Sequence, residues 1–339
     1  MSAQEREQQP LGACCSQHAR LAALAAALVT SSGVLLTVFV SAVGVPTPLP
    51  SVLVQLQTPS STFHLNPKPL KGLRVMYGVL TCAAYNEKLE AQLDTWAARP
   101  RAQGLFLAVA GRGFPPERQV AGSVVAVDCD DSPRGNSCKE ASLVLEAARR
   151  NASWLVIIGD DNYVDTVQVE ASLRSKVATD PIGMGLIGCG QGLPRYGPLV
   201  ARNGGLCGGG GEILSGAAVQ RLAAAGRDAL LREYGDETQC DMSTSGALLR
   251  RGIPLTSFPG RLNGMPIYKK DRIKGEIGAH GVTFHYVAPK LMRWLHAVMA
   301  RPVDEERLRA LEAEAFEGNC VRFFGHVWEM QRRRECQLQ

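Results

Sequence analysis

The sequence predicts an α/β protein with a mostly parallel central sheet flanked by helices, preceded by one N-terminal transmembrane helix. Three observations lead to this fold class. Strand-like and helix-like segments alternate from residue 73 onward. An uncharged apolar stretch occupies residues 21–45. The chain of 339 residues is 45% hydrophobic and 20% charged, which excludes a disordered or collagen-like protein and allows a sizeable core.

The first half of the globular part alternates regularly. Its strands are short runs rich in Val, Ile and Leu, whereas in its helices apolar residues recur three or four positions apart, as Leu89, Leu93 and Trp96 do. This order predicts a parallel sheet covered by helices, with ligands bound beyond the carboxyl ends of the strands. The elements expected are a strand at 73–81, a helix at 87–97, strands at 105–110 and 123–128, a helix at 137–150, a strand at 154–158 and a helix at 166–176.

The second half is rich in glycine and less regular, and residues 207–211 read CGGGG. Gly252 and Pro254 end one of its predicted helices. The elements expected here are helices at 217–225 and 244–251, a strand at 281–287 and a charged helix at 302–315.

Residues 21–45 are long enough to cross a bilayer, which takes about 20 residues of helix. Arg20 precedes this stretch and no charged residue follows it until Lys68, so the flanking charge predicts residues 1–20 as a cytoplasmic tail. The run is longer than the apolar part of a signal peptide, which favours an uncleaved signal anchor. The alternative is cleavage, which would release a soluble secreted enzyme.

Residues 46–70 are rich in Pro, Ser and Thr, which predicts a stem before a lumenal domain at 71–339. Of ten cysteines, Cys14 and Cys15 precede the apolar run, where they are palmitoylated or simply inert thiols. Eight follow it, an even number typical of disulfides in an oxidising lumen, and the sequence leaves their pairing open. Asn151 begins a glycosylation sequon or a chance match to one.

The net charge is +5, but the sequence contains no basic patch interleaved with aromatic residues. No nucleic-acid partner is therefore predicted. Asp160 and Asp161 directly follow the apolar strand at 154–158. Adjacent carboxylates indicate a divalent cation beside a diphosphate, or a solvated acidic turn. His285 lies between Phe284 and Tyr286 and is a core residue or a metal ligand.

Two further groups of residues are candidates for chemistry. Glycines 208–211 let the backbone approach a ligand closely, unless they form a plain surface loop. Asp241, with Asp236 and Glu237 nearby, is placed before a predicted helix, where it is a helix cap or a general base for a sugar hydroxyl.

Several segments in order resemble the fringe-like β1,3-glycosyltransferases, a GT-A family. The most specific stretch is Ser-Cys-Lys at 137–139, a helix, and then SWLVIIGDDNYV at 153–164, similar to the family's helix, strand and Asp-Asp-Asp-Asn-Tyr-Val turn. The resemblance spans about residues 73–287. Its other segments are Thr81, Asp-Thr-Trp at 94–96, GGGGEILS at 208–215 and GIPLT at 252–256.

The resemblance implies a GT-A domain on a single-pass membrane protein of the Golgi or ER. It implies a metal-dependent, inverting transfer of a sugar from a UDP-sugar to a hydroxyl of a glycan or glycoprotein, forming a β1,3 linkage. It assigns Mn²⁺ or Mg²⁺ to Asp161 and His285, the catalytic base to Asp241, and a disulfide to Cys129 and Cys138. The residues it assigns to donor binding are Thr81, Lys139, Asp160, Gly209 and Gly210.

The sequence departs from the family pattern at two places. Gly159 stands where the first acidic residue of the triplet is expected, and the base motif reads Gln239-Cys240-Asp241. The base therefore remains open between Asp236, Glu237 and Asp241. The alternative function is a catalytically inactive, glycosyltransferase-like binding protein, such as a lectin or chaperone.

Overall fold

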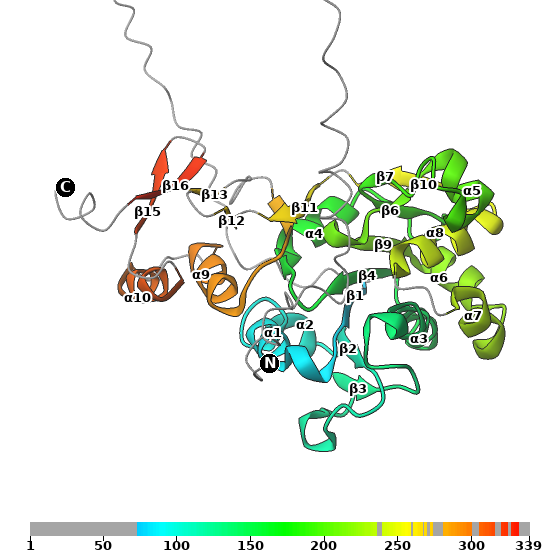
Figure 1. Ribbon diagram of the computed structural model, residues 1–339, viewed down its shortest axis with the longest axis horizontal. Coiled ribbons are helices and arrows are strands. Elements are labelled where there is room, and N and C mark those ends of the chain that lie inside the picture. The colour runs from blue at the N-terminus through cyan, green and yellow to red at the C-terminus, as the bar shows by residue number, and fades with distance from the viewer. Residues whose placement is uncertain are drawn as a thin grey trace, which may run out of the picture. The chain divides into compact units, whose positions relative to one another are not determined.

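The predicted mixed α/β fold with a mostly parallel central sheet is confirmed (Figure 1). The computed structural model describes residues 73–235, 239–258, 260–266, 268–269, 272–273, 281–299, 305–315, 320–324 and 327–331. Among these residues the main sheet has seven strands, all parallel to their neighbours except β9. In spatial order they are β10 (Leu255–Ser257), β6 (Gly183–Gly185), β9 (Glu212–Ser215), β4 (Trp154–Gly159), β1 (Val75–Leu80), β2 (Phe106–Ala110) and β3 (Val124–Ala126).

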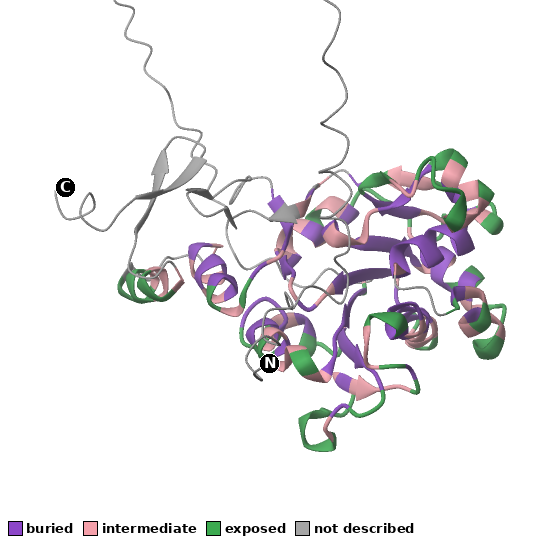
Figure 2. Ribbon diagram, viewed as in Figure 1, coloured by how far each residue is buried: buried purple, intermediate pink, exposed green. Residues whose placement is uncertain are grey.

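The strands form because both faces of this sheet are buried. Along β1, Val75, Tyr77 and Val79 belong to one hydrophobic cluster, whereas Met76 and Leu80 belong to a second cluster on the opposite face. Continuous apolar runs are typical of strands covered on both sides. Figure 2 shows the central strands almost wholly buried.

Helices cover each face. The second cluster contains residues of α3 (Asn136–Arg149), α6 (Gly216–Ala223), α7 (Arg227–Tyr234) and α8 (Cys240–Arg250). The first cluster contains residues of α1 (Asn86–Leu93), α4 (Thr166–Leu173) and α9 (Pro289–Met299). The remaining helices are α2 (Ala98–Ala102), α5 (Gly197–Asn203) and α10 (Glu305–Ala315).

Small sheets complete the described structure. The most important for the site pairs β14 (Gly281–His285) with β11 (Arg261–Pro266) on one side and β5 (Tyr163–Val164) on the other. Phe284 and Val282 of β14 are buried in the first hydrophobic cluster, which fixes this sheet against the main one. Three two-stranded sheets remain, formed by β7 (Ile187–Cys189) with β8 (Gly205–Leu206), β12 (Tyr268–Lys269) with β13 (Arg272–Ile273), and β15 (Cys320–Phe324) with β16 (Val327–Gln331).

The main differences from the predicted elements lie in the second half. The helix expected at 244–251 begins at Cys240, so Asp241 lies in its first turn and not before it. Helices α7 and α9 and strand β9 are present but were not predicted. The described residues contain no helix long and apolar enough to span a membrane, and the predicted anchor at 21–45 lies outside them.

We predict that Leu143→Ala destabilises the fold by about 2–5 kcal/mol, the usual cost of a cavity at a buried leucine. Leu143 is fully buried on α3, and a Cβ placed on Gly78 of β1 would lie 2.9 Å from its Cδ1. The helix and the strand therefore touch directly at this point. Chemical denaturation measures the loss, and Leu145→Ala, at a partly buried position of the same helix, serves as the control. Equal losses for the two variants would contradict this packing.

Candidate active site

The acidic turn follows β4 at the edge of the sheet where the parallel strands end. Leu80 of β1 pairs with Gly159 of β4, so Thr81 and Asp160 leave the sheet side by side. The Thr81 hydroxyl donates a hydrogen bond of 3.0 Å to Asp160 Oδ2, and both residues are buried. Two of the residues assigned to donor binding therefore meet directly.

The two aspartates differ in their tendency to ionise. Burial, followed by the negative charge of Asp161, raises the pKa of Asp160 well above its usual range. Burial would also raise the pKa of Asp161, but the hydrogen bond and charge of His285 and the charge of Lys88 outweigh it, so this pKa is lowered. Asp161 is thus the carboxylate better suited to bind a cation.

His285 approaches Asp161 from β14. Its Nε2 lies 3.4 Å from Asp161 Oδ1, and its Nδ1 lies 3.0 Å from the carbonyl oxygen of Gly264. In a neutral imidazole whose Nδ1 donates to that carbonyl, Nε2 has a lone pair, an arrangement common among metal-ligating histidines. In the imidazolium both nitrogens donate, and the Nε2 proton faces Asp161. Within the described ranges, no three His, Cys, Asp or Glu side chains form a group that could hold a metal ion.

The Asp161 and His285 pair nevertheless fits the chemistry of a metal that shares its ligands with a substrate. Divalent cations at phosphate-transferring sites commonly bind one or two protein groups and take their remaining ligands from water and phosphate oxygens. Carboxylate oxygen and imidazole nitrogen are both suitable ligands for Mn²⁺.

The glycine segment lies against this pair. A Cβ on Gly209 would be 2.7 Å from His285 Nδ1, so only glycine fits there without displacing the ring. The Asn162 amide donates to the carbonyl of Gly209 at 2.9 Å, and the Thr283 hydroxyl donates to that of Gly210 at 2.6 Å. The segment is therefore tied to both the acidic turn and β14.

Asp241 lies on the other side of the glycine segment. Its Oδ2 accepts a hydrogen bond of 2.9 Å from the amide of Gly208, and its Oδ1 accepts one of 3.0 Å from the amide of Met242. Asp241 and His285 therefore contact consecutive glycines, which brings the predicted base and the predicted metal ligand to the same segment. Asp236 and Glu237 lie outside the described residues.

The profile of the Fringe-like family matches residues 72–260. The chain belongs to the Fringe-like family. The predicted family is thereby confirmed, and the match covers the acidic turn, the glycine segment and Asp241.

Two relatives agree with this assignment. The chain is 25% identical over 251 residues to a mouse protein named beta-1,3-glucosyltransferase, and 24% identical over 236 residues to a human protein of that name. These matches cover 70% and 67% of this chain but 47% and 43% of the relatives, so the chain spans about half their length. Both relatives are named as glycosyltransferases.

A solved structure, that of mannose-1-phosphate geranyltransferase from Thermus thermophilus, also matches. Its TM-score is 0.29 at 16% identity, and the match covers 55% of this chain and 69% of the other. This similarity is too low to indicate anything about the site.

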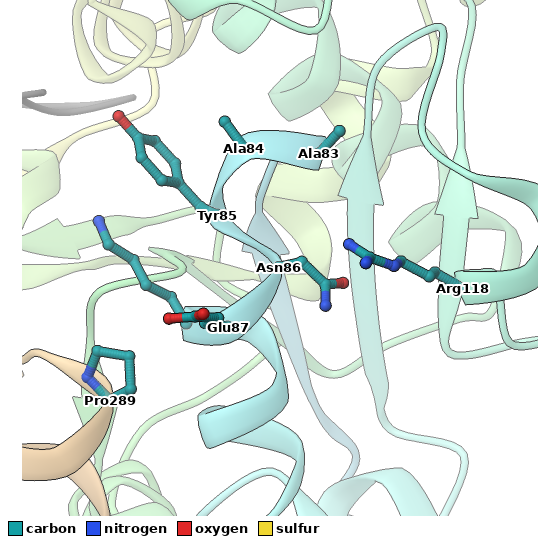
Figure 3. Close-up of a pocket in the computed structure, with 8 residues that line it drawn as sticks. Ala83, Ala84, Tyr85, Asn86, Glu87, Arg118 and Pro289 are labelled. Carbon is teal, nitrogen blue, oxygen red and sulfur yellow. The ribbon is translucent and has the colours of Figure 1, made fainter.

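Sequence reasoning missed Lys88 on α1 of the Fringe-like domain. Its Nζ lies 3.8 Å from Asp160 Oδ1 and 3.7 Å from Asp161 Oδ2. The contact joins α1 to the turn after β4, and no local sequence signal reports such a pairing. Lys88 also lines a pocket of about 390 Å³, together with Tyr85, Glu87, Arg118 and their neighbours (Figure 3).

Lys139 lies beneath the site. It is fully buried, and its Nζ donates a hydrogen bond of 3.0 Å to the carbonyl of Thr81. This places the ammonium behind the end of β1, where it supports the backbone from which the Thr81 hydroxyl projects. Its predicted contact with the donor stays a prediction.

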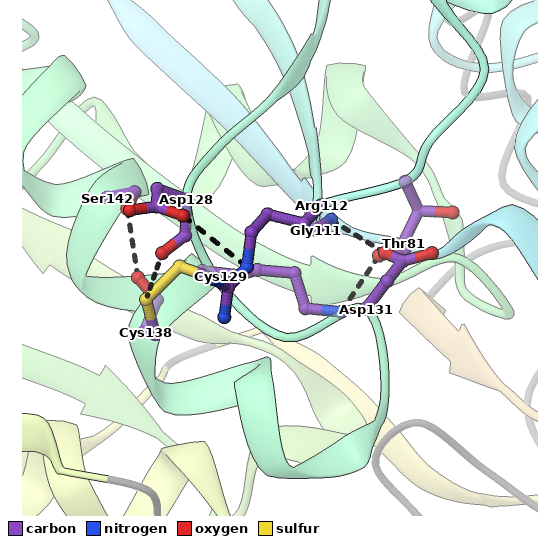
Figure 4. Close-up of a disulfide and its surroundings, with 9 residues drawn as sticks. Thr81, Gly111, Arg112, Asp128, Cys129, Asp131, Cys138 and Ser142 are labelled. Carbon is purple, nitrogen blue, oxygen red and sulfur yellow. Dashed lines mark hydrogen bonds and ion pairs between the residues drawn. A yellow bond between two sulfur atoms is a disulfide. The ribbon is translucent and has the colours of Figure 1, made fainter.

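Two disulfides hold the loops around the site. The implied bridge between Cys129 and Cys138 is present (Figure 4). The loop it closes contains Asp131, whose carboxylate accepts hydrogen bonds from the amides of Gly111 at 2.6 Å and Ala83 at 2.8 Å. The second bridge could not be paired from the sequence. It joins Cys189 to Cys207, immediately before the glycine segment.

A buried polar cluster positions the start of α8. Glu140 of α3 is fully buried and accepts hydrogen bonds from the Thr244 hydroxyl and the Cys240 thiol. Thr244 also donates to, or accepts from, the Tyr234 hydroxyl at 2.9 Å. Burial raises the pKa of Glu140 to about 7; the two hydrogen bonds oppose the shift and the charge of Asp241 adds to it. Glu140 thus contacts, from α3, the first turn of α8, which carries the predicted base Asp241.

We predict that Glu140→Gln changes the pH dependence of stability. The pKa of Glu140 is about 7 in the folded protein against 4.5 for a free carboxyl, so the folded state holds its proton more tightly. Between these values the wild type loses stability as the pH rises, by on the order of 1–3 kcal/mol in all. The glutamine variant lacks this loss, and its melting temperature relative to the wild type should rise from pH 5 to pH 8.

Glu146→Gln is the matched control on the same helix. Glu146 pairs with Arg149 and Arg150, which lower its pKa to about 2 despite partial burial. Its ionisation is complete by pH 5, so its effect on stability should be constant from pH 5 to pH 8. Parallel stability curves for the wild type and Glu140→Gln would contradict the buried, protonated Glu140.

Proposed function

We propose that the chain is a metal-dependent inverting glycosyltransferase that moves a sugar from a UDP-sugar to a hydroxyl of a glycan or glycoprotein, forming a β1,3 linkage. The observation that carries this proposal is the contact of Asp161 with His285 at the carboxyl edge of the sheet of a Fringe-like domain. The names of the two relatives support the linkage.

Asp161 and His285 would hold Mn²⁺ or Mg²⁺, which when bound supplies positive charge to the departing diphosphate. Thr81 keeps Asp160 in place by its hydrogen bond, and Lys139 supports the backbone of Thr81. Gly209 leaves room beside the imidazole, so the glycine segment lies against this region without displacing His285. A closed segment would exclude water and limit hydrolysis of the donor.

Asp241 would accept the proton of the acceptor hydroxyl as that oxygen attacks the anomeric carbon. A carboxylate that already accepts hydrogen bonds from two backbone amides is fixed in orientation. A fixed orientation toward the acceptor is what a general base requires. Attack from the face opposite the diphosphate would invert the anomeric configuration.

We further propose that residues 21–45 anchor the chain in the Golgi or ER membrane with the domain in the lumen. The two disulfides in the described part support an oxidising compartment. Asn151 is exposed in a turn with φ of 52°, where an oligosaccharide would project into solvent.

We predict that Asp161→Asn lowers Mn²⁺-dependent UDP release by about 100-fold or more, because the anionic metal ligand is lost. The assay uses the purified full-length chain with a panel of UDP-sugars and monosaccharide acceptors, with and without Mn²⁺. Asp94→Asn, which changes an exposed aspartate directly after α1, is the control. Full release by Asp161→Asn would show that this carboxylate holds no metal needed for turnover.

We predict that Asp241→Asn lowers the rate of transfer by about 10²–10⁴-fold while UDP binding is retained, because the amide keeps the shape of the side chain but accepts no proton. Transfer assays with the active UDP-sugar and calorimetry with UDP separate the two effects. Unchanged transfer would move the role of base to Asp236 or Glu237.

The alternative is a glycosyltransferase-like protein that binds without turnover, and Gly159 is the feature that favours it. UDP binding without release from any UDP-sugar by the wild type would support this alternative.

A further inference from the structure

Lys88 is placed between two environments. On one side its ammonium lies within 4 Å of both aspartates of the acidic turn. On the other it lies 4.1 Å from the centre of the Tyr85 ring and faces the pocket, with 24% of its side chain exposed. Figure 3 shows Tyr85, Asn86 and Arg118 around that pocket, with the Arg118 guanidinium directed toward Asn86.

The ammonium and a divalent cation would compete for the same carboxylate. Lys88 reaches Asp161 Oδ2, and His285 reaches Asp161 Oδ1. A dication held by Asp161 would lie within a few ångströms of the ammonium, where like charges repel strongly in a partly buried site. One of the two charges has to move. A lysine on a flexible four-carbon stem, with part of its length exposed, is the group able to do so.

The pocket offers Lys88 a second position. Lys88 links it to the acidic turn, and its lining holds Arg118 as a second cation beside one acid, Glu87. A diphosphate bound there would take the ammonium as a charge-assisted hydrogen-bond donor. The same lysine would then neutralise the aspartates in the ligand-free protein and the phosphates in the loaded protein.

We infer that Lys88 is an exchangeable cation of the site: it holds the acidic turn in the absence of a metal ion, is displaced by the metal, and then binds the diphosphate of the donor. This inference rests on the proposed function. It predicts that Lys88 weakens the binding of the metal ion alone. It also predicts that Lys88 strengthens the binding of a diphosphate to the metal-loaded protein.

The test measures Mn²⁺ and UDP binding to the full-length protein, not turnover. Free Mn²⁺ is followed by electron paramagnetic resonance without UDP, and UDP binding by calorimetry at saturating Mn²⁺. Lys88→Met should bind Mn²⁺ about 3- to 10-fold more tightly and UDP about 10-fold more weakly than the wild type, since one positive charge is removed in each case. Lys88→Arg keeps the charge and should restore UDP binding.

Lys290→Met is the matched control, because Lys290 follows Pro289 of the pocket rim, is 62% exposed and pairs with Glu314 at 4.0 Å. It should bind both probes as the wild type does, and melting temperatures confirm that each variant is folded. Mn²⁺ binding that is unchanged or weaker in Lys88→Met would overturn the role of Lys88 and leave the proposed function standing. A wild type that binds neither probe would overturn both.

Discussion

The site depends on the parallel pairing of β1 with β4. Their register places Leu80 opposite Gly159, so the chain leaves both strands at the same edge and level. Because each strand buries alternate side chains in a different hydrophobic cluster, a shift of one residue would exchange the two faces. The core therefore fixes the position of the acidic turn relative to Thr81, and the functional groups themselves contribute little to that alignment.

Burial then decides what each polar group can do. Asp160 is nearly inaccessible and has a raised pKa, while Asp161, one residue further from the sheet, stays ionised through His285 and Lys88. Lys139 is buried entirely and serves the backbone of Thr81. Similar side chains at one edge thus take different roles according to depth. The more deeply buried groups shape the site, and the shallower ones remain available for a ligand.

The sequence predicted those parts of the structure that depend on local pattern. Runs of apolar residues predicted the central parallel strands, because a strand that is buried on both faces is apolar along its whole length. Strand β9 was missed because its four residues are too short for periodicity, and its antiparallel pairing is non-local. Helix α9 did carry a signal, with Leu291, Trp294, Leu295 and Val298 on one buried face. The contact of Lys88 with the acidic turn, and the Cys189–Cys207 bridge, arise only from the tertiary fold.

Gly159 is consistent with a turn whose charge is balanced without a third acid. A Cβ at this position would lie 3.1 Å from Asp161 Oδ1 and 3.2 Å from Asn162 Oδ1. Asn162 Oδ1 accepts the amide of Gly159, and its Nδ2 donates to Gly209, so the space is used to tie the turn to the glycine segment. A further carboxylate there would repel Asp161 and raise the pKa of Asp160 further. With two aspartates the turn carries less negative charge beside Lys88 than it would with three. The absence of the expected first acid is therefore explained by the charges around the turn, and it need not mean that the site has lost its ligands.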